Sequence, residues 1–168
     1  AFFFVMIRRP LRSTLFPYAA LFRSASAVAL NTLTGLADNA LDAEIVQRPN
    51  TAAGDLATIA GRTPNAADLV FIAGHAHADA VALDAVMGNR VLDDAARTAV
   101  AANNNASAGA LNTLTGLNDA ALDAEIVQRP NTAAADLETI AGRRAADAVI
   151  IAAIRAHARA GDALVVAA

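Results

Sequence analysis

Three histidines are the side chains best suited to chemistry near neutral pH. His75 and His77 form an H-x-H pair, and His157 lies in the same H-A-x-A context as His75. Imidazole nitrogens are common zinc ligands, and Asp79 would supply a third ligand beside the pair. A zinc-bound water at such a site would make the chain a His-based, metal-dependent hydrolase.

A second interpretation of the histidines is structural. A leucine recurs along the chain, and equivalent positions can be counted back from each copy of it. The position of His75 is held elsewhere by Arg48, Asn103 and Arg129, and the position of His77 by Asn50, Asn105 and Asn131. Polar residues, asparagine above all, are typical of turns. We therefore favour turn residues over metal ligands, and the run from Asn103 to Asn105 is interpreted as a turn in the same way.

Acidic residues are candidates for a carboxylate pair in general acid–base catalysis. The candidates are Asp42, Glu44, Asp68, Asp93, Asp94, Asp123 and Glu125. Asp93 and Asp94 are adjacent, and the others recur with the repeat described below, which we interpret as a solvated face. The sequence contains no Ser/His/Asp arrangement, phosphate-binding glycine loop or H-E-x-x-H motif. It predicts a protein that is not an enzyme, with no cofactor, no catalytic residue and no metal ligand.

The composition of the chain excludes further classes of function. The chain of 168 residues has no cysteine, which excludes disulfides and thiolate metal sites, and its 13 basic residues are all arginine. Residues 1–24 carry a charge of +4, so that the remaining residues carry −7 of the formal net charge of −3. An acidic body with a single aromatic residue, Phe71, argues against nucleic-acid binding. No apolar run reaches the ~18 residues of a membrane span; we expect a cytoplasmic protein.

A repeat organises the chain from residue 25 onward. Six leucines recur every 26–28 residues: Leu30, Leu56, Leu83, Leu111, Leu137 and Leu164. An apolar residue follows each of the first five at the third position, which places both on one helix face. On a larger scale, residues 25–62 and 106–143 are identical at 33 of 38 aligned positions. The sequence thus predicts units that start near 25, 51, 78, 106, 132 and 159.

The ends of the first helix in each unit are predicted from glycine and threonine. Glycine follows each of the first five leucines at the fifth position: Gly35, Gly61, Gly88, Gly116 and Gly142. Glycine just beyond a last turn adopts the left-handed conformation at low cost, so we expect it to close the helix. Thr51 and Thr132 are expected to cap the helices that follow, with Asp55 and Asp136 in their first turns.

A second element follows in each unit and is predicted to be a helix. Apolar pairs at i, i+4 spacing indicate it, namely Leu41/Ile45, Ala96/Val100 and Leu122/Ile126. Helices this short are marginal alone, so each unit must bury its apolar face against its neighbours. The predicted fold is all-α, an α-solenoid of about six helical repeats of 26–28 residues.

The stretches 45–61, 100–116 and 126–142 resemble the leucine-rich repeat variant family, whose pattern runs roughly V-A-x-N-P-x-T-P-x-x-x-L-x-x-L-A. The matching residues are Pro49, Thr51, Leu56, Ile59 and Ala60, and again Pro130, Thr132, Leu137, Ile140 and Ala141. The resemblance covers residues 25–168 and implies a right-handed superhelix of α-helices alternating with short 3₁₀ or α elements. This sequence departs from the pattern, with Arg48 for the family's asparagine and Ala52 for its second proline. Its longer units are nearer to HEAT-type repeats.

Residues 1–24 do not share the repeat. Residues 2–24 hold five of the six phenylalanines and the only tyrosine, without a helical or strand period. They resemble the conceptual translation of a sequencing adapter, as found in assembled metagenomic reading frames, and we expect a non-native, disordered leader. The domain of interest is then residues 25–168.

The function predicted for a bacterial repeat protein of this kind is a non-enzymatic scaffold that binds a protein or peptide. Equivalent turn positions line up along one rim of a solenoid, which predicts a partner-binding ridge of Gln47, Arg48, His75, Asn103, Gln128 and Arg129. The alternative is that these residues only hydrogen-bond the turns. A further alternative is a truncated scaffold segment of a larger multidomain protein whose activity lies elsewhere, with possible self-association through uncapped ends, where Leu164 would be exposed.

Calorimetric titration with zinc tests the hydrolase hypothesis. We expect no binding to the chain, because the repeat pattern places His75 and His77 in turns. The control is the double variant His75→Ala plus His77→Ala. Zinc binding that disappears in this variant would restore the metal site as a candidate.

Overall fold

The computed structural model describes residues 25–157, 159 and 161, and within them the chain forms ten α-helices and no strand. The helices are α2 (Ala27–Thr34), α3 (Asn39–Ile45), α4 (Ala53–Arg62), α5 (Ala66–Gly74), α6 (Ala80–Met87), α7 (Asp94–Ala102), α8 (Ala108–Thr115), α9 (Ala120–Ile126), α10 (Ala134–Arg143) and α11 (Ala148–Ala156). The predicted all-α fold is confirmed for this part of the chain, and in the five units that the structure describes the second element is an α-helix.

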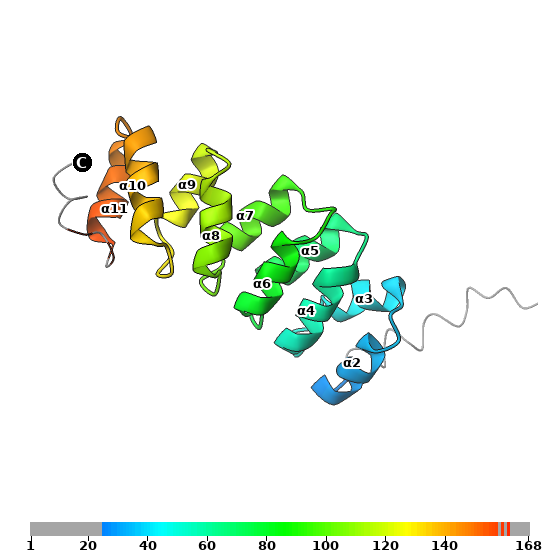
Figure 1. The fold of residues 1–168 in the computed structure, drawn as a ribbon. Helices are drawn as coiled ribbons and strands as arrows, with labels where there is room; N and C mark the ends of the chain where they lie inside the picture. The colour runs from blue at the N-terminus through cyan, green and yellow to red at the C-terminus, as the bar shows by residue number, and fades with distance from the viewer. Residues whose placement is uncertain (1–24, 158, 160, 162–168) are drawn as a thin grey trace, which may run out of the picture.

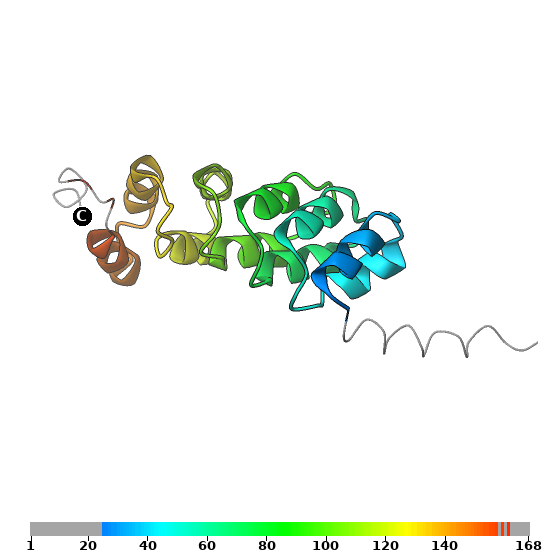
Figure 2. The same cartoon turned by 90° about the horizontal axis from the view of Figure 1, so that it is seen from below.

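The helices form five consecutive pairs, each with a first helix (α2, α4, α6, α8, α10) and a second helix (α3, α5, α7, α9, α11). The pairs follow one another in an elongated array (Figure 1). Seen at right angles, first and second helices form two rows (Figure 2). Each first helix contacts the next first helix, and α7 contacts both α5 and α9 in the second row. This arrangement is compatible with an α-solenoid.

The core lies between the two rows and follows the predicted leucine column. Side chains of Leu30, Leu56, Leu83, Leu111 and Leu137 are all fully buried. Second helices contribute their own buried column of Ile45, Ile72, Val100, Ile126 and Ile154. Each buried aliphatic side chain stabilises the fold by roughly 1.5–3 kcal/mol relative to exposure. The helices are only seven to ten residues long, so this burial between neighbours is what holds them folded.

Short polar side chains begin most of the helices. Asp38, Asp79, Asp93, Asp119 and Asp147 each accept hydrogen bonds from the first free amides of a helix. The capping role predicted for Thr51 and Thr132 is wrong. Both hydroxyls are fully buried and donate backward, to the carbonyls of Ile45 and Ile126, and the N-caps of α4 and α10 are alanines without a side-chain bond. Asp55 and Asp136 do lie in the first turns, as predicted.

Gly35, Gly88 and Gly116 are the C-caps of α2, α6 and α8, as predicted, but the left-handed geometry predicted for them is wrong. No glycine of the described residues has a positive φ, and Gly35 and Gly116 have φ of −62° and −59°. Gly61 lies inside α4, where a Cβ would meet nothing within 4 Å. The left-handed positions are instead Ala37 and Asn118, with φ of 53° and 55°. Both stand two residues after a glycine, immediately before the aspartate that caps the next helix.

Several predictions concern features outside the described residues or finer than the fold itself. The leader (1–24) and most of the sixth unit, including Leu164, lie outside the described residues. The first helices begin at Ala27, Ala53, Ala80, Ala108 and Ala134, close to the predicted unit starts at 25, 51, 78, 106 and 132. The right-handed superhelix and the count of six units stay predictions. No helix among the described residues has the length and hydropathy needed to cross a membrane.

Two opposite substitutions should both stabilise the protein. Gly61→Ala adds a methyl group in open space inside a helix and should raise the free energy of unfolding by about 0.5–1 kcal/mol. Ala37→Gly relieves a left-handed alanine and should raise it by up to about 1 kcal/mol. Urea unfolding measures both. Gly35→Ala is the control without a gain, because its Cβ would lie 3.2 Å from the Thr32 carbonyl oxygen. A loss of stability in Gly61→Ala would contradict the placement of Gly61 inside α4, and a loss in Ala37→Gly would contradict a strained alanine at that position.

Candidate functional site: the ladder of inter-pair turns

The residues of the predicted ridge lie where successive second helices end. We call the segments that join one pair to the next the inter-pair turns; they are residues 46–52, 75–79, 103–107 and 127–133, and a further one starts at His157. His75, Asn103 and His157 are the C-caps of α5, α7 and α11. Arg48 and Arg129 hold the same position in the other two turns, and positions in every turn are counted below from this residue as the first. The fold therefore brings this column to one edge of the array.

Asn103, at the first position of its turn, makes two hydrogen bonds of different kinds. In Asn103, Oδ1 accepts from the amide of Asn105 at 2.9 Å and Nδ2 donates to the carbonyl of Ala73 at 2.7 Å. The first bond shapes the turn itself, and the second ties it to the preceding pair. Each such bond contributes a net ~1 kcal/mol.

His75 and His157 make the same two bonds with their ring nitrogens. The Nδ1 atom of His75 accepts from the amide of His77 at 3.1 Å, and its Nε2 lies 2.7 Å from the carbonyl oxygen of Arg48. His157 pairs in the same way with the amide of Arg159 at 3.1 Å and the carbonyl of Arg129 at 2.8 Å. Histidine and asparagine thus make the same two kinds of bond at this position. The histidines reach the first position of the preceding turn, whereas Asn103 reaches a carbonyl inside α5.

The third position of each turn adds a second rung to the ladder. Its side chain reaches a backbone carbonyl at the matching place one unit earlier. The four rungs run from Asn50 to Ala25, His77 to Thr51, Asn105 to Ala78 and Asn131 to Ala106, over 2.6–3.1 Å. The fourth position closes the turn with a fully buried side chain in Thr51, Ala78, Ala106 and Thr132.

The two arginines of the ridge behave differently. Arg129 donates to the carbonyl of Ala102 and to Oδ1 of Asn104, both at 2.7 Å, and so crosses to the preceding turn. Arg48 does not cross; it pairs with Glu44 of the preceding helix at 2.8 Å, and Arg129 makes the equivalent pair with Glu125 at 3.2 Å. Gln47 and Gln128, one residue earlier, donate to carbonyls of their own helices, so their side chains lie along α3 and α9.

Two grooves open at equivalent seams beside this ladder. One, of about 660 Å³, lies between the ends of α5 and α7 and is lined by Gly74, His75, Ala99, Ala102 and the asparagine run 103–105, among others. The other, of about 440 Å³, lies between the ends of α9 and α11 and is lined in part by Gln128, Pro130, Ala153, Ala156 and His157. Three ridge residues, His75, Asn103 and Gln128, thus line grooves. At the seam between α3 and α5 the position equivalent to Ala153 carries Phe71, whose side chain is 49% exposed.

The histidine pair has the environment of a turn. The rings of His75 and His77 are 5.5 Å apart, edge to face, and their bonds go to backbone groups. Asp79, the suggested third ligand, accepts from the amide of Ala82 as the cap of α6. Among the residues that the structure describes, no group of three or more His, Cys, Asp or Glu is placed to hold a metal ion.

The opposite edge of the array holds ion pairs that the sequence interpretation missed. We call the segments between the two helices of a pair the intra-pair turns. Asp42 is fully buried and accepts from Arg62 Nε at 2.9 Å and from Arg62 Nη2 at 2.6 Å, while Arg62 also donates to the carbonyl of Thr34. This bidentate pair joins α3 to α4 of the next unit. Hydrogen bonding to Asp42 raises the pKa of Arg62, so this arginine stays charged at every pH near neutrality.

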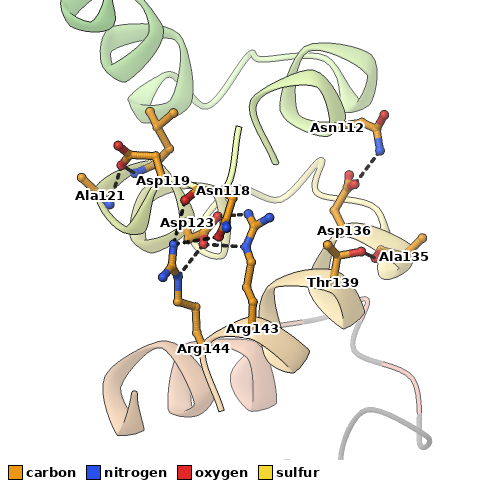
Figure 3. A network of polar contacts seen from close by, with 11 residues as sticks. Asn112, Asn118, Asp119, Ala121, Asp123, Ala135, Asp136, Thr139, Arg143 and Arg144 are labelled. Carbon is orange, nitrogen blue, oxygen red and sulfur yellow. Dashed lines mark hydrogen bonds and ion pairs between the residues drawn. The ribbon is translucent and has the colours of Figure 1, made fainter. Parts of the chain in front are cut away.

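Asp123 is the matching carboxylate in the fourth pair and has two arginine partners (Figure 3). It is fully buried, and both Arg143 and Arg144 donate to it, Arg144 Nε at 2.8 Å. Asp68 is buried as well and accepts from the Thr63 hydroxyl at 2.8 Å. The interpretation of the acids as a solvated face is therefore wrong for Asp42, Asp68 and Asp123. Asp42 and Asp123 occupy equivalent positions of the duplicated segments. That recurrence was the available signal for these two residues, and it marks structural anchors.

Two further buried carboxylates join neighbouring first helices. Asn31 donates to Asp55 Oδ1 and Asn112 donates to Asp136 Oδ1, each at 2.7 Å. The second pair is visible in Figure 3. In both aspartates the other oxygen is buried and has no hydrogen-bond partner among the described residues. Both pairs span 24 residues in the duplicated segments.

Comparisons with known proteins leave the site to be interpreted from its geometry. No protein-family model, curated protein or solved structure matches this chain.

Removing the Asp123 carboxylate should destabilise the array. Asp123→Ala leaves two arginines without their buried acceptor, but their side chains are 18% and 22% exposed and can reach water. The expected loss in the free energy of unfolding is therefore about 2 kcal/mol, below the range for a fully buried pair. Asp94→Ala removes an exposed pair with Arg97 and serves as the control, with at most about 0.5 kcal/mol. Equal effects in chemical denaturation would contradict an anchoring role for Asp123.

Proposed function

We propose that this chain is a non-enzymatic scaffold that binds a protein or peptide along the edge formed by its inter-pair turns and second helices. The observation that carries the proposal is the recurrence of one groove at two equivalent seams. A repeat array that offers the same recess at regular intervals suits an elongated partner.

The lining of the grooves indicates the kind of contact. Small apolar side chains of the second helices form the floor, among them Ala99, Ala102, Ala153 and Ala156. Polar turn residues at the rim supply fixed amide and imidazole groups. An apolar floor with a few convergent polar groups is the general character of a binding site. Phe71, exposed on the same row of helices, is the aromatic residue that would anchor a partner there.

The ridge residues serve the array and the partner together in this proposal. Side chains that tie one turn to the next are held in fixed positions, which lowers the entropy lost on binding. Their bonds to neighbouring turns therefore support preorganisation and leave the grooves beside them accessible. The right-handed superhelix of about six units and the kinship with leucine-rich repeat variant and HEAT-like proteins belong to the same proposal, as does a cytoplasmic location.

A peptide library displayed on phage tests the proposal with two matched double variants. Gly74→Arg plus Ala156→Arg fills both grooves, because these residues hold the same position in α5 and α11 and line them. Gly54→Arg plus Ala135→Arg adds the same charge at equivalent exposed positions of first helices. A Cβ at Gly74 or Gly54 meets nothing within 4 Å, so both variants should fold.

The expected result is that selected peptides bind the unmodified chain, lose about tenfold or more in affinity to the groove variant and bind the control variant unchanged. Calorimetry gives the affinities, and thermal melts confirm that both variants fold. Peptides that bind all three proteins equally would place recognition elsewhere, and an absence of enriched peptides would count against a peptide-binding scaffold.

A further inference from the structure

The seams between consecutive second helices differ at two equivalent residues. These residues stand four places and one place before the first position of an inter-pair turn, and we call them the floor positions. They are Ala99 and Ala102 in the α5–α7 seam, and Ala153 and Ala156 in the α9–α11 seam; all four line the two grooves. A groove therefore opens where both floor positions hold alanine, the side chain that fills least space after glycine.

The α3–α5 seam has a large side chain at the first floor position. Its floor residues are Phe71 and Gly74. The side chain of Phe71 is 49% exposed, so a ring stands at the place where Ala99 and Ala153 leave space. This seam thus offers an exposed aromatic surface to a partner instead of a recess for one of its side chains.

The middle seam, between α7 and α9, carries polar side chains at the same place. Its floor residues are Glu125 and Gln128. Arg129 pairs with Glu125 at 3.2 Å and also crosses the seam, where it donates to the carbonyl of Ala102 and to Oδ1 of Asn104, both at 2.7 Å. An apolar side chain that entered here would have to separate charged, hydrogen-bonded groups without replacing their bonds, which is costly. The two alanine-floored grooves are therefore separated by a seam that rejects apolar side chains.

The separation of the two grooves sets a length on the partner. The second helices follow one another in one row (Figure 2), and packed helices lie about 8–10 Å apart. The grooves are two helix spacings apart, which is about 16–20 Å. An extended peptide advances about 3.3 Å per residue and spans this distance in about five or six residues. An α-helix rises about 1.5 Å per residue and would need about eleven to thirteen.

The polar rim of the grooves favours the extended form. A helix satisfies its own backbone amides and carbonyls, whereas an extended peptide brings free donors and acceptors that need partners. Exposed asparagines at the turns, among them Asn104 and Asn105, offer amide groups along the path between the grooves.

The charge of this edge indicates a further feature of the partner. Residues 71–77, 99–105, 125–131 and 153–159 surround the grooves and contain three arginines and one glutamate, a charge of +2, whereas residues 25–168 as a whole carry −7. Arg129 is paired with Glu125, so the excess comes from Arg155 and Arg159. Arg159 lines the α9–α11 groove. A carboxylate beside the side chain that enters this groove would complement the two arginines.

We propose that the partner is an extended peptide with two aliphatic side chains about five or six residues apart, seated in the α5–α7 and α9–α11 grooves, and an acidic residue beside Arg155 and Arg159. The inference rests on the proposed function, because it specifies the peptide that the scaffold binds. Glu125 and Arg129 are then specificity-determining residues, since they keep apolar side chains out of the middle seam and so set the spacing.

A series of synthetic peptides tests the spacing on the whole chain. Each fluorescein-labelled peptide has two leucines at spacings from two to twelve residues in a background of serine and threonine, with one aspartate next to either leucine. In fluorescence polarisation, affinity should be highest at spacings of about five or six and about tenfold or more lower at two or nine. Equal affinity at all spacings, a maximum near eleven or twelve, or no binding by any member would overturn the inference. The peptides selected from the phage library decide the proposed function independently of this series.

The charge is tested with a matched pair of double variants. Arg155→Gln plus Arg159→Gln should remove the advantage of a peptide with aspartate over the same peptide with asparagine. Arg90→Gln plus Arg97→Gln removes two arginines outside the groove segments and should leave that advantage unchanged. An identical response of the two double variants would contradict the acidic residue of the partner.

Exchange of floor residues tests the middle seam. Glu125→Ala, Gln128→Ala and Arg129→Asn together give this seam the residues of the α5–α7 seam. Peptides with leucines about three residues apart, one helix spacing, should then bind about tenfold more tightly than to the unmodified chain. The reverse variant, Ala99→Glu plus Ala102→Gln, should weaken the peptides of spacing five or six by a similar factor. Thermal melts confirm that both variants fold, and an unchanged preference for spacing in both folded variants would refute the role of the floor residues.

Discussion

The shortness of the helices is the constraint on which this structure depends. Helices of seven to ten residues end so often that the chain must satisfy free amides and carbonyls every dozen residues or so. Such helices are unstable alone, and burial of one leucine and one isoleucine or valine column holds them together. The turns between them are therefore structural elements in their own right. Their polar side chains satisfy backbone groups of the preceding turn, so that each unit completes the one before it.

The two edges of the array join neighbouring units through different kinds of polar contact. The intra-pair edge uses buried aspartates that receive arginines from the next unit, as in the pair of Asp42 and Arg62. The inter-pair edge uses amides and imidazoles that bond to carbonyls, as Asn103 does. The edge beside which the grooves open is thus held by uncharged amide side chains and imidazole rings, and the opposite edge by ion pairs.

The duplication shows how neighbours decide what a side chain does. Arg48 and Arg129 occupy the same place in nearly identical segments. Both pair with the glutamate four residues earlier, but only Arg129 also donates to the preceding unit, at Ala102 and Asn104. In the same way Asp123 has two arginine partners because Arg144 stands where the earlier copy has Thr63. Copies of one sequence become different sites because the units beside them differ.

The sequence by itself determined the helical class, the spacing of the units, the buried leucine column and the position of the polar turns. These follow from periodicity, because a residue at i and another at i+3 or i+4 share a face whatever surrounds them. Predictions from local sequence rules were wrong at two places. At Gly61 the helix continues past its expected end, and the Thr51 hydroxyl donates to the preceding helix instead of capping the next one. Tertiary structure alone decided the burial of Asp42 and Asp123, the pairing of turns and the grooves. Each of these depends on two segments at least 20 residues apart coming into contact, and a local pattern carries no information on which partner a polar side chain will meet.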